Sequence, residues 1–210
     1  MTRPKGNADQ KLIQAARVLV EKTGFKNLKI RQVAKKANVN LGMFHYHFKN
    51  KKTFVYQILK DFYEDFFQKI SFEYSKSLST EKRLKLVMKT LSQFTTQHRK
   101  FLIAILADAL EGNTEVISFF KANVQRHASM IFQLLDEGQK ENWVQHLPRP
   151  ILMSFIAGSI TMPILIFTLI ERVHNTHPFG MQPQSCFQAL FSDQMIQKRI
   201  DLAVKAISKP

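Results

Sequence analysis

Apolar residues recur three and four residues apart along most of this chain, the spacing that places them on one face of a helix. Between these runs the sequence is punctuated by Gly, Pro, Asn and Ser. Beyond residue 60 no stretch shows the alternation of Val, Ile and Thr that is typical of a strand. The pattern predicts an all-α protein. Besides two short helices considered next, helices are expected at about 8–23, 51–76, 81–97, 100–111, 114–140, 150–173 and 186–207.

The two short helical patterns lie between residues 24 and 54. The first has an apolar stripe made of Ile30, Val33, Ala34 and Ala37. Asn38 suits the left-handed conformation that ends a helix, and Asn40 can cap the next helix by accepting a backbone N–H bond. In that next helix Phe44 and Phe48 are four residues apart and are expected to anchor it to the core. Two such helices, joined by a tight turn and rich in Lys, Arg and His, are typical of a DNA-reading helix-turn-helix.

The same stretch resembles the N-terminal domain of the TetR family of transcriptional regulators. The residues in register with the family pattern are Gly24, Ile30, Val33, Ala34, Ala37, Val39, Gly42, Phe44, His47, Phe48, Lys51 and Phe54. Three positions depart from it: Lys29 replaces the usual Ser or Thr cap, Asn38 the common Gly, and His45 the usual phosphate-contacting Tyr. The resemblance implies a three-helix helix-turn-helix domain over residues 1–50 and a helical effector-binding and dimerisation domain over residues 51–210.

On this resemblance we expect the helix-turn-helix to bind double-stranded DNA. Phosphate contacts are expected from Lys29, Arg31, Tyr46, His47 and Lys51, with Gln32 also among the DNA-binding side chains. Leu41, Met43 and His45 are expected to face base edges. Because Leu41 and Met43 offer only apolar contact, such as with thymine methyls, His45 is the polar candidate for hydrogen-bonded readout.

Positive charge is concentrated at the same end of the chain. Residues 1–60 hold 14 Lys or Arg against Asp9 and Glu21, a net charge of +12, whereas the whole chain carries +15. A polyanionic partner is therefore implied for the N-terminal quarter alone, and its binding should weaken steeply as salt rises. The alternative interpretation is a basic surface that is merely solvated.

Residues 151–170 form an almost wholly apolar run with the nominal length of a transmembrane helix. Small and polar residues dilute this run, and a helix that is apolar all round is also found buried in a protein core. Burial between an effector pocket and a dimer partner is our interpretation, and no membrane is expected. The resemblance implies that the last two long helices pair with those of a second copy in a four-helix bundle. Residues expected at this interface are Ser154, Gly158, Thr161, Met195, Arg199 and Leu202.

The 18 Phe residues of the chain suggest a pocket for a small apolar or aromatic effector. The expected apolar walls are Phe66, Phe94, Phe101, Trp143 and Phe155, and the polar candidates are His98, His127 and Ser159. The helix that begins near Lys51 is expected to link the two domains. Phe54 and Ile58 should belong with the N-terminal domain, whereas Phe62, Phe66 and Phe67 should point into the remainder.

Motifs of enzymes are missing from the sequence. It contains no G-x-S-x-G, no Gly-rich phosphate loop and no H-E-x-x-H, and we expect Asp108 and Glu111 to be a solvated helical pair. His174 and His177, with His146 as a third candidate, are too few and too irregularly spaced to predict a metal site. No cofactor is expected. Cys186 is the single cysteine, which suits a reducing cytoplasm, and the polar start MTRPKGN does not read as a signal peptide.

Together with the resemblance, these patterns predict a homodimeric, ligand-responsive regulator of transcription that lies in the cytoplasm and acts as a repressor. Two domains one helical turn of DNA apart, about 34 to 36 Å, would match a palindromic operator. One alternative is a DNA-binding regulator without small-molecule control. The other is a membrane-associated basic protein with residues 151–170 in lipid.

Overall fold

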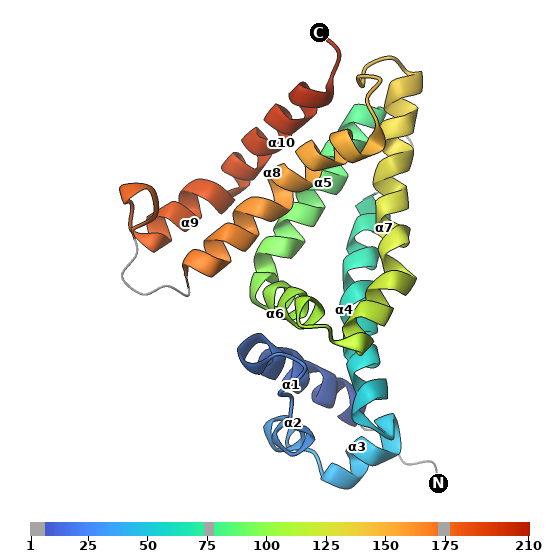
Figure 1. Cartoon of the computed structure of the whole chain (residues 1–210), viewed down its shortest axis with the longest axis vertical. Coiled ribbons are helices and arrows are strands. Elements are labelled where there is room, and N and C mark those ends of the chain that lie inside the picture. Colours follow the sequence, from blue (N-terminus) through green and yellow to red (C-terminus); the bar gives the residue numbers. More distant parts are fainter. Residues whose placement is uncertain (1–6, 74–77, 172–176) are drawn as a thin grey trace. The chain divides into compact units, whose positions relative to one another are not determined.

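A computed structural model of the chain describes residues 7–73, 78–171 and 177–210 (Figure 1). All the secondary-structure elements assigned in these residues are helices, which confirms the all-α prediction. The elements are α1 (Ala8–Thr23), α2 (Ile30–Ala37), α3 (Leu41–Phe48), α4 (Lys51–Glu73), α5 (Thr80–Gln97), α6 (Arg99–Leu110), α7 (Thr114–Lys140), α8 (Arg149–Ile170), the 3-10 turn η1 (Pro178–Gly180), α9 (Pro183–Phe191) and α10 (Asp193–Ile207). The predicted helix ends at 74–76 and 172–173 lie outside the described residues.

The chain divides into two compact units. The head unit comprises residues up to Asp65 together with Lys100–Val124, and the body unit comprises Phe66–Arg99 and Gln125–Pro210. The head unit therefore adds parts of α4, α6 and α7 to the three N-terminal helices. The sequence resemblance alone places only residues 1–50 in the DNA-binding domain.

The core of the helix-turn-helix is aromatic. Phe44 and Phe48 of α3 are buried and meet Phe54 of α4, with ring centroids 5.1 and 4.6 Å away. Asn38 ends α2 in the left-handed conformation with φ of 52°, and the side chain of Asn40 accepts the Gly42 N–H at 2.8 Å. Both predictions for the turn are thus confirmed, and the turn is set by local side-chain chemistry.

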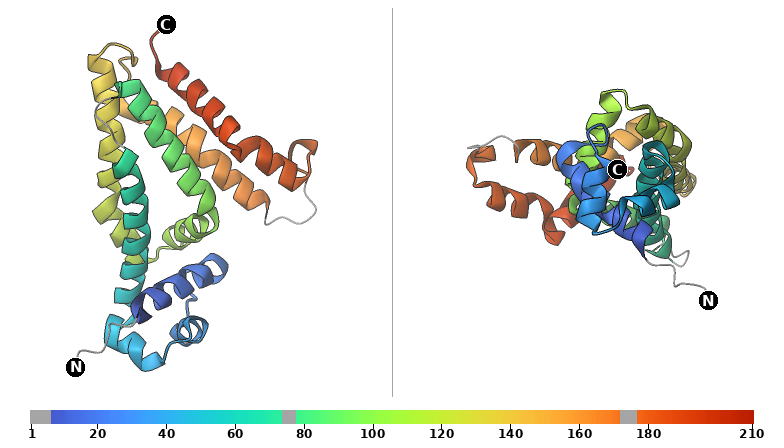
Figure 2. Two further views of the ribbon diagram at one scale, coloured as in Figure 1. Left: turned by 180° about the vertical axis from the view of Figure 1, so that it is seen from behind. Right: turned by 90° about the horizontal axis from the view of Figure 1, so that it is seen from below.

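In the body unit, α8 packs against α5 and α10, and Figure 2 shows α8 and α10 side by side. Its buried stripe contains Leu152, Ile156, Ile160, Ile164 and Phe167. Among the described residues α8 is the one helix long and apolar enough, by length and composition, to cross a membrane. One side of it is nevertheless part of a protein core, while Phe155, Met162, Ile166 and Leu169 remain exposed on the other.

The prediction of one helix over 186–207 is wrong. The segment forms two helices, α9 and α10, that meet at Ser192, whose backbone is extended with φ of −63° and ψ of 149°. Ser192 is the N-cap residue of α10 without a side-chain capping bond, and the acidic Asp193 in the first turn is favourable at the positive end of the helix dipole. Phe191 is buried with Ile164, Phe167 and Cys186 just before the break.

The prediction of a solvated pair at Asp108 and Glu111 is also wrong for Asp108. The Asp108 side chain is buried, with 4% of the residue exposed, whereas Glu111 is exposed. On α6, Asp108 lies three and four residues after Ile105 and Ala104, and seven after Phe101, all of which are buried. It therefore occupies the buried stripe of the helix, and this spacing was the available signal.

Candidate nucleic-acid interface

The first side chains expected to contact DNA lie on α2 and its N-terminal cap. Lys29 is the N-cap residue, and its side chain makes no capping bond to the helix. Lys29, Arg31 and Gln32 are all exposed. Val33 and Ala34 bury the opposite side of α2 in the head unit, which leaves the polar side chains in solvent. In this position they can reach phosphate oxygens.

The residues expected at base edges lie on α3. Met43 and His45 are exposed, Leu41 is half-buried, and Tyr46 is 77% exposed. Phe44 packs edge-on against the exposed His45, with centroids 5.4 Å apart, so one contact of the imidazole is with a buried core side chain. The surface of α3 therefore combines apolar contact with one imidazole and one phenol.

His47 and Lys51 lie less openly than the other predicted phosphate contacts. His47 is half-buried, and its Nε2 is enclosed without a hydrogen-bond partner. The Nζ of Lys51 donates to the backbone oxygen of Lys26 at 2.9 Å. Burial lowers the pKa of Lys51, and the nearby carboxylates of Asp108 and Glu115 oppose that shift. Lys51 thus ties α4 to the loop between α1 and α2.

An arginine that the sequence pattern did not single out joins α1 to α4. Arg17 donates to Asp61 at 2.7 Å and to Asp65 at 2.9 Å, and its guanidinium lies 5.4 Å from the ring centroid of Phe62. Phe62 in turn packs on Phe101, with centroids 4.7 Å apart. Phe62 thus lies in the head unit, where it meets both Arg17 of α1 and, as expected, a ring from a later helix.

The loop between α1 and α2 is bound by the buried carboxylate of Asp108. Its Oδ2 accepts the Phe25 N–H at 2.6 Å, and its Oδ1 accepts the Lys26 N–H at 3.0 Å. The amide of Asn113 donates to Oδ1 at 3.3 Å. These donors compensate the carboxylate for its loss of water. Nearby, exposed Glu111 pairs with the side chain of Lys26 at 3.3 Å.

Three of the expected effector-contacting residues come together in the body unit. Phe66 and Phe94 have ring centroids 4.9 Å apart, and Phe94 lies 4.5 Å from the His98 ring. Both phenylalanines are buried and His98 is half-buried. An apolar wall beside one imidazole is a combination suited to an apolar molecule with a polar end.

The other expected effector contacts lie apart from this cluster. Phe101 is buried in the head unit against Phe25, with centroids 5.9 Å apart. Trp143 follows α7 and donates its indole N–H to Glu141 at 3.2 Å. The side chain of His127 lies outside the described residues. Phe155 and Ser159 lie on the outer side of α8, where Phe155 is 45% exposed.

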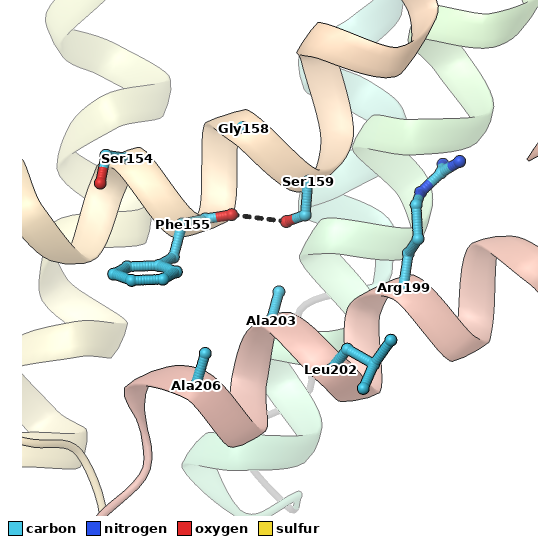
Figure 3. A pocket seen from close by; sticks show the side chains of 8 residues that line it. All are labelled: Ser154, Phe155, Gly158, Ser159, Arg199, Leu202, Ala203 and Ala206. Carbon is cyan, nitrogen blue, oxygen red and sulfur yellow. Dashed lines mark hydrogen bonds between the residues drawn. The ribbon is translucent and has the colours of Figure 1, made fainter.

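An open groove runs between α8 and α10 in the body unit (Figure 3). The residues lining it are Ser154, Phe155, Gly158, Ser159, Arg199, Leu202, Ala203 and Ala206. Four of the six residues expected at the dimer interface are among them, whereas Thr161 and Met195 are half-buried outside it. Figure 3 shows Phe155 facing this groove, with Ser159 donating to its backbone oxygen at 2.6 Å. The groove is apolar and small residues line its floor.

Arg199 is held at one end of this groove. Its guanidinium donates to the backbone oxygen of Leu190 at 2.5 Å and lies 5.4 Å from the ring centroid of Phe191. Burial lowers the pKa of Arg199, and its Nε is enclosed without a hydrogen-bond partner. Arg199 therefore braces α10 against α9.

The described residues contain no group of three His, Cys, Asp or Glu side chains that could hold a metal ion. Of the histidines considered from the sequence, His174 lies outside the described residues. Cys186 is buried in the cluster of Ile164, Phe167 and Phe191, where it packs as a small apolar side chain.

Comparison with known proteins agrees with this arrangement. Residues 12–58 match the family described as "Bacterial regulatory proteins, tetR family". The chain is 25% identical over 185 residues to the "Probable HTH-type transcriptional regulator YttP" of Bacillus subtilis, covering 83% of this chain and 85% of that protein.

Two solved structures share the fold over nearly the whole chain. The fatty acid degradation regulator FadR from Bacillus halodurans matches with a TM-score of 0.73 and 18% identity, covering 96% of this chain and 97% of its own. FadR from Bacillus subtilis in complex with stearoyl-CoA matches with a TM-score of 0.67 and 17% identity, covering 88% and 98%. Residues 12–58 thus form a helix-turn-helix of the tetR type, and the chain as a whole shares its all-helical fold with solved transcriptional regulators.

Proposed function

We propose that this regulator binds a palindromic operator as a homodimer, represses transcription there, and is released by a small apolar or aromatic effector. The observation that carries the proposal is the outer surface of α2 and α3. It exposes Lys29, Arg31 and Gln32 at α2 and Met43 and His45 on α3, while α2 buries Val33 and Ala34 and α3 buries Phe44 and Phe48. Cations position a protein on the phosphates while the side chains of the second helix read base edges.

The proposed dimer forms through the groove between α8 and α10. Phe155 and Leu202 are 45% and 67% exposed there, while Gly158 leaves open space where a Cβ would lie. Large apolar side chains beside small ones allow two identical surfaces to interdigitate about a two-fold axis. Such a dimer would cover the outer side of α8, which accounts for its apolar exposure without a membrane.

The proposed effector site is the cluster of Phe66, Phe94 and His98 in the body unit. Apolar walls favour a molecule with an acyl chain or a fused ring over a sugar. The stearoyl-CoA bound by FadR of Bacillus subtilis, a protein of the same fold, supports an acyl effector as the first to test.

Control would follow from a shift in population. Suppose the effector binds more tightly when the two DNA-binding domains are not spaced for the operator. The ratio of its affinities for the two arrangements is then the factor by which it weakens operator binding. Repression then ends when the effector accumulates in the cytoplasm. The competing function is a regulator that keeps the same DNA-binding surface but senses no small molecule.

The test begins with selection of operator DNA. Purified full-length protein is mixed with random duplexes at physiological salt, and the retained fragments are sequenced. A palindrome with half-sites one helical turn apart is the expected result. Fragments without a shared sequence, recovered at low and physiological salt alike, would contradict operator binding.

A second step tests effector control. The selected operator, labelled with a fluorophore, is titrated with protein in the presence of stearoyl-CoA, stearate or free coenzyme A. Release by the acyl compounds but not by coenzyme A supports an apolar effector. If a wider set of apolar and aromatic compounds leaves binding unchanged, and none raises the melting temperature of the protein, control without a small molecule is favoured.

A further inference from the structure

The backbone N–H and the backbone oxygen of Lys26 are hydrogen-bonded to side chains of opposite charge. Asp108 of α6 accepts the N–H of Lys26 at 3.0 Å and that of Phe25 at 2.6 Å. Lys51 of α4 donates to the backbone oxygen of Lys26 at 2.9 Å. All of these residues belong to the head unit. The loop from α1 to α2 is thus fixed by one carboxylate and one ammonium group.

Close approach by the carboxylate depends on Gly24. This residue has φ of +69°, and a Cβ built on it would lie 2.8 Å from Oδ2 of Asp108. A larger residue would therefore push the carboxylate away from the Phe25 and Lys26 amides, besides straining the backbone. At this point the loop and α6 are in close contact, with no space for an added side chain.

A buried carboxylate held by backbone N–H groups constrains position tightly. Charge-assisted hydrogen bonds are short and directional, and leaving the Asp108 charge without them would be costly in a site that is 4% exposed. The loop ends at Lys29, the N-cap of α2, directly before the exposed side chains of Arg31 and Gln32. Any displacement of α6 must carry this loop along or break both hydrogen bonds.

We propose that Asp108 is a positioning residue for DNA binding, which couples α6 to α2 by holding the Phe25 and Lys26 amides. It touches no DNA itself and acts through the start of α2. This inference rests on the proposed operator binding.

The test compares Asp108→Asn and Asp108→Glu with Glu111→Gln as the matched control. Asp108→Asn and Glu111→Gln each remove one negative charge at or just after the end of α6 and turn one acceptor oxygen into an amide donor, but only at Asp108 do both oxygens accept backbone N–H bonds. Asp108→Glu keeps the charge and moves the carboxylate outward by one methylene. Hydrogen exchange of the Phe25 and Lys26 amides and affinity for the selected operator are measured for each protein, with thermal unfolding to establish folding.

Both Asp108 variants should speed exchange at the two amides and lower operator affinity by about tenfold or more, as expected for one lost charge-assisted bond. Glu111→Gln should change neither by more than about twofold, because its ion pair is exposed. A folded Asp108→Asn protein with wild-type exchange, or with faster exchange and wild-type affinity, would overturn the proposal. If only Asp108→Asn lost amide protection and operator affinity, the charge of the side chain and not its position would matter, and the proposal would again be overturned.

Exchange in the wild-type protein gives a result even if neither variant folds. The Phe25 and Lys26 amides should exchange about tenfold or more slowly than that of the exposed neighbour Asn27. Equal rates would mean that the carboxylate does not hold the loop. Failure of the wild-type protein to select any operator would instead count against the proposed function, and leaves the exchange result to decide the role of Asp108 in the fold.

Discussion

The guanidinium of Arg17 contacts the carboxylate of Asp61 at 2.7 Å, joining α1 to α4 across 44 positions of sequence. Both side chains are mostly buried, at 13% and 19% exposure. The pair borders Phe62, so a polar contact and an aromatic packing contact reinforce each other. This contact fastens α1 to the middle of α4.

Asp61 should make stability depend on pH in a defined direction. Burial raises its pKa above 3.8, and Arg17 partly opposes that shift. Between 3.8 and the raised pKa the folded state holds more protons than the unfolded state, so this contribution to stability falls as pH rises through the window. Denaturant unfolding of the wild type and Asp61→Asn is measured at steps of pH. As pH falls through this window, the free energy of unfolding of the wild type should rise relative to that of the variant.

Arg17→Met supplies the check on this assignment. Without the cation, the largest influence that opposes burial is gone, and the pKa of Asp61 rises further. The pH range over which stability changes should therefore widen upward. A shift of that range to lower pH would contradict the assignment to Asp61.

Replacing Lys51 by Met should have two effects with separate readouts. The backbone oxygen of Lys26 loses its donor, which should lower the free energy of unfolding by about 1 kcal/mol. Loss of a phosphate contact should weaken binding to every DNA sequence and reduce the salt slope by about 1. Lys52→Met is the stability control, because the Lys52 ammonium is exposed and 3.9 Å from Glu115. Unchanged stability in Lys51→Met would contradict the observed bond.

Replacing Met43 by Ala should alter sequence preference and not general affinity. An apolar contact with one base position contributes on the order of 1 kcal/mol to the selected operator and nothing to random duplexes. Competition assays with operator and random DNA measure the ratio. Val18→Ala, which trims an exposed apolar side chain on α1, should leave both affinities unchanged. If Met43→Ala lowers the affinity for operator and for random DNA equally, Met43 does not read sequence and supports the structure of the domain instead.

Replacing Leu202 by Asp should yield a monomer. In the proposed dimer each copy would bury one carboxylate without a partner, at a cost of about 3 kcal/mol or more per site. Sedimentation velocity across a concentration series gives the dissociation constant. Leu110→Asp on α6 is the control, because Leu110 is 80% exposed and lies outside the groove. If Leu202→Asp dimerises with the dissociation constant of the wild type, the dimer interface lies outside this groove.

The sequence was sufficient for features that depend on neighbours along the chain. The turn at Asn38 and Asn40 and the buried pair Phe44 and Phe48 follow from backbone preference and helical spacing. The basic N-terminal quarter also follows from composition alone. These are local properties, and the structure agrees with them.

Only the tertiary structure decided which distant groups meet. Asp108 was interpreted as solvated, yet it is buried against Phe25, 83 positions earlier. Arg17 and Lys51 likewise have their partners on other helices. One residue type can be a solvated charge or a buried hydrogen-bond acceptor, and the difference depends on what folds over it.

The same holds for the division of the aromatic residues. Phe62 was expected to point into the remainder of the chain and Phe94 and Phe101 to line an effector pocket, and all three are buried. Whether each packs in the head unit or lines the body unit depends on which helix is opposite. Burial of apolar surface has no direction, so the amino-acid sequence determined that these side chains leave water, and the packing of the helices determined where they go.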